Sequence, residues 1–301
     1  MRRLKLKSQS QADEFTSICY WPGPEGAPVI HWAHANGFNG LTYKSLLAPL
    51  SEYFHVYASD ARGHGKSNLS ADPEKHIGWD IYRDDLLNTV EFLEARHHAP
   101  IFLAGHSMGG CASAMAAAYL PQHLMGVVLV DPVIIPPHVK LLSSLQALLG
   151  RKSHGSDLRI MASRRRADWP SVAAMEKAYS GRGAFATWKP EFLKDYLVGG
   201  TLKAEAGVKL ACAPLWEAAN FASQQHDSLT PIRRIEVPMT LLVAEKGSTT
   251  RGLAAFRKNP NTRKIDVVDG STHFLPMEFP ERVREEIIEL AKQSGALTRN
   301  A

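Results

Sequence analysis

Short apolar runs rich in β-branched residues alternate along the chain with longer stretches of helical character. The runs are nearly continuous, which is the pattern of parallel strands covered on both faces. They predict strands at Pro28–Trp32, Phe54–Ser59, Ile101–Ala104, Val127–Val130, Met239–Val243 and Lys264–Val268. The stretches between them predict helices at Tyr43–Ser51, Trp79–Ala95, Met108–Leu120 and Glu281–Lys292. This alternation favours a doubly wound α/β sheet.

The alternation of strands and helices breaks between residues 134 and 231. This stretch reads as helical and loop-like, and Pro136-Pro137 stands near its start as a breaker. We therefore predict a helical cap at residues 134–231, inserted into a core formed by residues 1–133 and 232–301. The apolar run at 139–149 either roofs an apolar site or forms the small core of the cap itself.

The composition is that of a globular protein, because 45% of the 301 residues are hydrophobic and 22% are charged. No apolar run approaches the roughly 20 residues of a membrane helix, so we expect no stable membrane insertion. Four basic residues lie among the first seven, but no apolar stretch of signal-peptide length follows them. We therefore expect a cytoplasmic protein.

The cysteines and histidines predict no metal site. Three widely spaced cysteines form neither a disulfide framework nor a zinc pattern, and the 13 histidines lack a metal-binding spacing. The net charge of +5 is spread along the chain, apart from Arg164-Arg165-Arg166. Such a short run is more often a solvated helix face than a nucleic-acid site, so we expect no nucleic-acid partner. The sequence leaves the oligomeric state open.

The strongest chemical signal is the G-x-S-x-G segment from Gly105 to Gly109, which follows one predicted strand and opens a predicted helix. A serine on such a sharp turn has a strained backbone, so its neighbours two residues before and after must lack bulk. The amino-terminal end of the helix favours negative charge at the serine. These features predict that Ser107 is a nucleophile.

Four blocks in this order make the chain resemble the α/β-hydrolase family: His34–Phe38, Asp60–Ser67, Gly105–Gly110 and Ser271–Phe274. The resemblance covers nearly the whole chain outside the cap. It implies an α/β-hydrolase fold, in which a mostly parallel eight-stranded sheet is flanked by helices and interrupted by the inserted cap. It also implies catalytic groups on loops at the carboxyl ends of the strands.

The first block corresponds to a family loop that supplies one N–H group to the oxyanion hole. By this resemblance the donors are the backbone N–H groups of Asn36 and Met108. Ala35 stands where the family usually has glycine. The Asn36 side chain either binds substrate or only tolerates a left-handed turn conformation. In the Asp60–Ser67 block, Asp60 and Arg62 are expected to organise backbone by hydrogen bonds.

The family places its general base after the last strand, and the matching histidine is His273. We expect His64 and His106 to pack or hydrogen-bond in place. The third member of the triad departs from the family pattern, because Gly247 stands where the usual aspartate is expected. Two carboxylates could replace it: Asp131 at the end of an earlier strand, which we favour, and Glu245.

The predicted chemistry is acyl transfer on a small-molecule ester, with Ser107 as nucleophile, His273 as general base and no cofactor. A lactonase, a thioesterase, a carbon–carbon bond hydrolase and a cofactor-free perhydrolase would use the same machinery. A protein of another class, a non-catalytic binding protein with a degenerate triad, is favoured only by Gly247.

Overall fold

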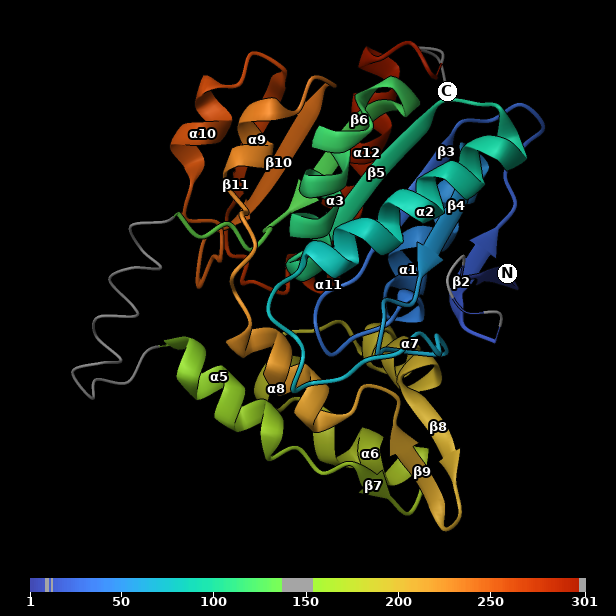
Figure 1. Cartoon of the computed structure of the whole chain (residues 1–301), viewed down its shortest axis with the longest axis vertical. Helices are drawn as coiled ribbons and strands as arrows, with labels where there is room; N and C mark the ends of the chain where they lie inside the picture. Colours follow the sequence, from blue (N-terminus) through green and yellow to red (C-terminus); the bar gives the residue numbers. More distant parts are fainter. Residues whose placement is uncertain (9–10, 12, 137–153, 298–301) are drawn as a thin grey trace.

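The structure is a computed structural model that describes residues 1–8, 11, 13–136 and 154–297. An eight-stranded sheet runs through its centre (Figure 1). Its strands are β1 (Arg2–Lys7), β2 (Phe15–Trp21), β3 (Val29–Ala33), β4 (His55–Ser59), β5 (Ile101–His106), β6 (Leu124–Val130), β10 (Met239–Ala244) and β11 (Thr262–Val268). Their order in the sheet is β1-β2-β4-β3-β5-β6-β10-β11.

The direction of the strands confirms the predicted mostly parallel sheet. Strand β2 is antiparallel to both of its neighbours, β1 and β4, and every other neighbouring pair is parallel. The loops that follow β3, β5, β6, β10 and β11 therefore all emerge at the end of the sheet where the parallel strands have their carboxyl ends. In open sheets of this kind, binding and catalytic residues collect at that end.

Helices cover both faces of the sheet. One face packs against α2 (Asp80–His97), α3 (Met108–Tyr119), α9 (Thr230–Arg234) and α10 (Leu253–Lys258). The other face packs against α1 (Lys44–Leu47), α11 (Leu275–Glu278) and α12 (Pro280–Gln293). Successive residues of a strand enter different cores: Phe102 lies in one and Leu103 in the other. This double burial explains the continuous apolar runs in the sequence. Short 3₁₀ helices are η1 (Gly40–Tyr43), η2 (Ala48–Glu52) and η3 (Pro121–His123).

The apolar runs reveal six of the eight strands and miss β1 and β2. Strand β1 reads RRLKLK, and its side chains are largely exposed. A strand at the edge of a sheet needs no continuous apolar run, because only part of it is buried. Arg3 nevertheless ties this strand to the core through an ion pair of 2.7 Å with Asp60. The single helix expected at Tyr43–Ser51 was also wrong in part, since η1, α1 and η2 divide it.

The chain leaves the sheet after β6 and returns to it at β10, and residues 134–231 between them are called the inserted segment here. Figure 1 shows its helices and strands as a separate layer at one end of the sheet. The run at 139–149 lies outside the described residues. The described elements are α5 (His154–Ser163), β7 (Asp168–Trp169), α6 (Val172–Tyr179), η4 (Gly183–Phe185), α7 (Pro190–Gly200), β8 (Thr201–Ala204), β9 (Gly207–Leu210) and α8 (Pro214–Ala222), before α9 returns the chain to the sheet.

The inserted segment is less helical than the sequence pattern suggested. Strands β7, β9 and β8 form a small antiparallel sheet that was not predicted from the sequence. The alternation of apolar and polar residues from Thr201 to Leu210 is the signal that could have revealed it. In the part of the chain that the structure describes, no helix is both long and apolar enough to cross a membrane.

Candidate active site

Ser107 lies on the turn between β5 and α3, with the strained backbone that the motif requires. Its φ is 57° and its ψ is −118°, a region that residues with a side chain rarely adopt. A Cβ atom on Gly105 would lie 2.5 Å from the carbonyl oxygen of Gly109. A Cβ atom on Gly109 would lie 2.2 Å from the carbonyl oxygen of Ala33. The steric expectation for both glycines is therefore confirmed.

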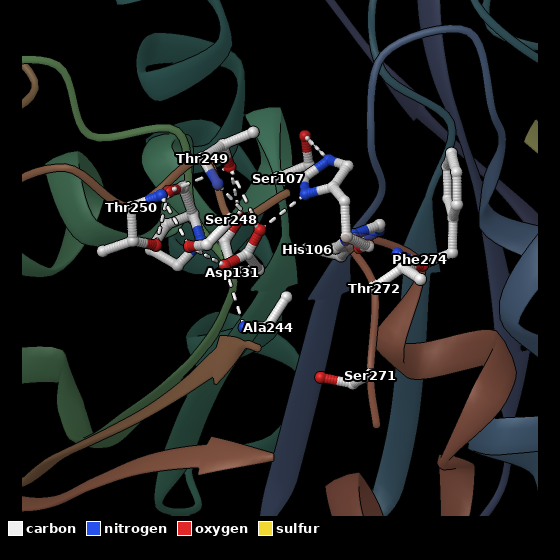
Figure 2. A network of polar contacts seen from close by, with 12 residues as sticks. His106, Ser107, Asp131, Ala244, Ser248, Thr249, Thr250, Ser271, Thr272 and Phe274 are labelled. Carbon is white, nitrogen blue, oxygen red and sulfur yellow. Dashed lines mark hydrogen bonds and ion pairs between the residues drawn. The ribbon is translucent and has the colours of Figure 1, made fainter. Parts of the chain in front are cut away.

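Three side chains from three loops form one series of hydrogen bonds (Figure 2). His273 Nε2 lies 3.0 Å from Ser107 Oγ, and His273 Nδ1 lies 2.6 Å from Asp131 Oδ2. The carboxylate of Asp131 accepts the proton of Nδ1, so Nε2 is left to accept from the serine hydroxyl. The structure thus brings together the predicted nucleophile, the predicted base and the favoured acid.

The carboxylate of Asp131 is fully buried and surrounded by hydrogen-bond donors. Its Oδ1 accepts from Ala244 N at 3.1 Å and from Ser248 Oγ at 2.5 Å, and its Oδ2 accepts from Thr249 N at 3.0 Å. Burial alone would raise the pKa of Asp131. The hydrogen bond and charge of His273, with the donors from Ser248 and Thr249, outweigh burial and hold this pKa below its ordinary value.

Glu245, the alternative acid, lies outside this series. Its Oε2 accepts a hydrogen bond from Gly270 N at 2.9 Å, and its side chain is 45% exposed. Gly247, which occupies the position of the usual family acid, has a φ of +67°. The residues directly after it, Ser248 and Thr249, donate to Asp131 instead. The sequence did not suggest these two donors, although they directly follow Gly247, which occupies the position of the expected aspartate.

The predicted oxyanion loop is a turn that begins at Ala35. Phe38 N donates to Ala35 O at 3.1 Å, and Gly37 has a φ of +77°. Among the described residues the positive φ values outside glycine belong to His98, Ser107 and Asp131, so Asn36 does not adopt the left-handed conformation. That alternative was therefore wrong, since the glycine that follows takes the strained position.

The side chain of Asn36 is engaged by protein and not directed to a free ligand position. Its amide Nδ2 donates to the carbonyl oxygen of Glu217 at 3.0 Å. Met108, the other predicted donor, is the first residue of α3. The N–H group of a first helical residue has no carbonyl partner within its own helix, which suits it to bind an anion.

A series of buried hydrogen bonds connects the predicted oxyanion loop to His273, the predicted base. His106 Nε2 lies 2.7 Å from the carbonyl oxygen of His273, and His106 Nδ1 lies 2.8 Å from the Tyr43 hydroxyl. Burial, followed by the charge of His273, lowers the pKa of His106 to about 3, so its ring is neutral. Nε2 carries the proton because a carbonyl can only accept. Tyr43 therefore donates to His106 and accepts from Ala35 N at 3.2 Å.

Asp60 and Arg62 both bond to backbone groups, as expected, and Arg62 Nη1 donates to the carbonyl oxygen of Ser70 at 2.8 Å. Asp60 accepts from Gly40 N and Lys66 N, both at 2.9 Å, and thus organises the backbone below the oxyanion loop. Within the cluster of three arginines, however, Arg165 is not on a solvated face. Its side chain is only 20% exposed and forms an ion pair with Glu217. No group of three potential metal ligands occurs within the described ranges.

Comparison with known proteins agrees with this geometry. A family model described as the alpha/beta hydrolase family matches residues 30–286. The 2-(acetamidomethylene)succinate hydrolase of Mesorhizobium japonicum is 29% identical over 263 residues, which cover 84% of each chain. The monoglyceride lipase of Rattus norvegicus is 35% identical over 138 residues, or 43% of this chain and 44% of the lipase.

Solved structures show the same fold. E-2-(acetamidomethylene)succinate hydrolase superposes with a TM-score of 0.76 at 21% identity, covering 97% of this chain and 99% of that one. A thioesterase domain from the curacin biosynthetic pathway superposes with a TM-score of 0.69 at 20% identity, covering 96% and 99%. Because the family model spans most of the sheet and the segment inserted into it, this chain belongs to the alpha/beta hydrolase family and is a hydrolase.

Proposed function

We propose that this hydrolase cleaves a carboxylic ester through a covalent acyl-enzyme. The observation that carries the proposal is the series of hydrogen bonds from Ser107 Oγ through the His273 ring to the Asp131 carboxylate, with distances of 3.0 and 2.6 Å. A serine hydroxyl is a weak nucleophile until a neighbouring base removes its proton. The arrangement supplies that base, and it supplies a buried carboxylate that orients and stabilises it.

In the first step Ser107 Oγ attacks the ester carbonyl carbon while its proton passes to His273 Nε2. The carbonyl oxygen becomes an oxyanion, which the N–H groups of Asn36 and Met108 bind. Each donor contributes about 10²- to 10³-fold to turnover, because it meets charge that develops only in the transition state. His273 then protonates the leaving alcohol as the carbonyl re-forms, and the acyl group stays on Ser107.

In the second step a water molecule releases the acyl group. His273 Nε2 takes a proton from the water as its oxygen attacks the acyl carbon, and the same two N–H groups bind the second oxyanion. The tetrahedral intermediate collapses, the proton returns to Ser107 Oγ, and the carboxylic acid leaves. Asp131 stays ionised and stabilises the positive imidazolium in both steps. The mechanism needs no metal and no organic cofactor.

We also propose that residues 134–231 are a cap over a core formed by residues 1–133 and 232–301. Aromatic rings from both parts meet beside the catalytic base. Trp188 of the inserted segment lies 5.1 Å from Phe38 and 5.8 Å from Phe274, measured between ring centroids. The Phe274 ring lies 5.7 Å from that of His273. Such a wall favours a small or medium-sized apolar acyl group.

A second candidate is the reaction for which the relative from Mesorhizobium japonicum is named, hydrolysis of 2-(acetamidomethylene)succinate. The observation in its favour is 29% identity over 84% of both chains. A substituted succinate carries two carboxylates, which a cation near Ser107 without an anionic partner would complement. The partly buried Arg165 is paired with Glu217, which leaves its charge largely compensated. This pairing makes the ester the first choice.

The decisive experiment is labelling with a fluorophosphonate. We expect one adduct per chain at Ser107, located by mass spectrometry, and none in the Ser107→Ala variant. Absence of labelling in the wild type would overturn the serine mechanism and favour a non-catalytic binding protein. A panel of p-nitrophenyl esters of increasing chain length, a lactone, a thioester and 2-(acetamidomethylene)succinate then separates the ester proposal from the second candidate.

A further inference from the structure

One residue of the inserted segment contacts the oxyanion loop through both its backbone and its side chain. Glu217 lies on α8, and its carbonyl oxygen accepts a hydrogen bond of 3.0 Å from Asn36 Nδ2. Its carboxylate covers Gly37, since a Cβ atom on that glycine would lie only 2.7 Å from Glu217 Oε1. Asn36 and Glu217 are 9% and 8% exposed, so water competes little with these contacts.

The carboxylate of Glu217 is held by a second residue of the inserted segment. Arg165 Nη1 lies 2.5 Å from Glu217 Oε2, and Arg165 Nη2 donates to the Tyr196 hydroxyl at 2.8 Å. The side chain of Arg165 is 20% exposed, and that of Glu217, counted without its backbone, is 10% exposed. A buried pair of this kind fixes geometry, because removal of either partner leaves an uncompensated charge. Arg165 therefore fixes the position from which Glu217 meets the loop.

The core holds the same loop from the other side. Gly37 N donates to His64 Nε2 at 3.0 Å, and Ala35 N donates to the Tyr43 hydroxyl at 3.2 Å. Within the described residues, the amide N–H of Asn36 lies between these two engaged amides and has no such partner. The core thus fixes the backbone on both sides of Asn36, while the inserted segment fixes the Asn36 side chain.

We propose that Glu217 and Arg165 are positioning residues that complete the oxyanion hole by holding Asn36 from the inserted segment. The proposal rests on the serine mechanism above, and it adds that the segment takes part in the chemistry besides covering the substrate. Asn36 offers its backbone N–H to the oxyanion, and its side chain holds the residue in place by its hydrogen bond to the Glu217 carbonyl oxygen. A shift of about 1 Å at a catalytic group costs on the order of 100-fold in rate.

The test compares four variants with the wild-type enzyme: Asn36→Ala, Glu217→Ala, Glu217→Gln and the double variant Asn36→Ala/Glu217→Ala. Leu215→Ala is the matched control, because Leu215 lies on the same helix with 64% of its surface exposed. The kinetic constants kcat and KM are measured with a p-nitrophenyl ester. The inhibition constant of an alkyl boronic acid is measured in parallel, since its tetrahedral adduct with a serine places an oxygen in the oxyanion hole.

We expect Asn36→Ala to lower kcat about 10- to 100-fold with KM within about threefold of wild type, and to weaken boronic acid binding by a similar factor. Glu217→Ala is expected to act in the same direction and Glu217→Gln to recover most of the loss, because glutamine keeps an acceptor for Arg165. The double variant should resemble the more damaged single variant, since the Glu217 side chain acts on Asn36 by holding in place the backbone carbonyl that Asn36 Nδ2 binds. Leu215→Ala should leave all three constants unchanged.

Three results would overturn the inference while leaving the serine mechanism standing. One is unchanged boronic acid binding in Asn36→Ala and Glu217→Ala. Another is an effect confined to KM, and the third is a double variant whose losses multiply. If Glu217→Ala does not fold, Asn36→Ala and Glu217→Gln carry the same test. If the wild type takes neither the fluorophosphonate nor the boronic acid, the proposed function itself fails.

Discussion

Ser248 donates a 2.5 Å hydrogen bond to the carboxylate of Asp131, from the loop in which the family pattern expects the acid itself. Asp131 stands at the end of β6, and Ser248 follows β10, its neighbour in the sheet. Both strands are parallel, so their carboxyl ends lie together at one edge. A carboxylate can therefore reach His273 from either strand, and the loop that lacks the acid supplies donors to it.

Replacement of Ser248 by alanine is expected to raise the pKa of Asp131, because it removes a donor that stabilises the charged form. The acidic limb of the pH profile of kcat/KM should move to higher pH, and kcat should fall about tenfold. Steady-state kinetics across the pH range measure both. Ser248→Thr keeps the hydroxyl and should retain the wild-type profile. An unchanged acidic limb in Ser248→Ala would show that this donor does not act on the triad.

Asp131→Asn is expected to lower kcat by about 10⁴-fold, because the amide cannot hold the imidazole in the required tautomer or stabilise its positive form. Glu245→Gln should stay within about threefold of wild type, since that side chain is bonded to Gly270 N outside the triad. Both variants are assayed with the same ester, and their folding is compared by circular dichroism. A collapse of activity in Glu245→Gln alone would reverse the assignment.

The sequence predicts the fold and the nucleophile because their physical requirements are local. Parallel strands buried on both faces leave continuous apolar runs, and Phe102 and Leu103 show this by entering opposite cores. The elbow at Ser107 needs two glycines at fixed spacing, and the contacts of Gly105 and Gly109 show why. Such signals can be read within a few residues of one another.

The parts that the sequence does not reveal depend on contacts between distant residues. Asn36 meets Glu217 across 181 positions, and no pattern near either residue indicates the pair. Arg165 reads as one of three surface arginines, although its carboxylate partner lies 52 positions away. The choice between Asp131 and Glu245 is of the same kind, because it depends on how neighbouring strands align and not on the residue type.

Tyr43→Phe is expected to destabilise the protein by about 1–3 kcal/mol, because it leaves buried polar groups of His106 and Ala35 without their partner. Turnover should fall as well, since the chain of hydrogen bonds ends at the carbonyl of His273. Urea unfolding and kcat with the same ester measure the two effects. Tyr53→Phe, a change at a partly buried ring of the same region, is the control and should affect neither. If Tyr43→Phe and Tyr53→Phe have the same stability and the same kcat, the hydrogen bonds of the Tyr43 hydroxyl have no role in either.

The buried histidines predict a stability that falls as the pH is lowered from neutral. Burial is the main cause that lowers the pKa of His31, His64 and His106 to about 3 in each case. In the unfolded chain, a histidine has its unperturbed pKa of about 6.5. Between these values the unfolded chain binds more protons than the folded chain, so the free energy of unfolding rises with pH. The loss of stability caused by these histidines is absent above about pH 6.5 and grows as the pH falls toward about 3.

Each such histidine contributes a slope of up to about 1.4 kcal/mol per pH unit, which urea unfolding at about pH 7 and about pH 5 can measure. His31 gives the sharpest test, because it lies within β3 with Nε2 2.9 Å from Ser59 Oγ and its other ring nitrogen is buried without a partner. His31→Gln should remove the contribution of one titrating histidine from the slope of the free energy of unfolding against pH, because glutamine does not titrate. This expectation holds whatever the stability of the variant at neutral pH. If the variant and the wild type lose stability in parallel between the two pH values, His31 is not the group that takes up the proton on unfolding.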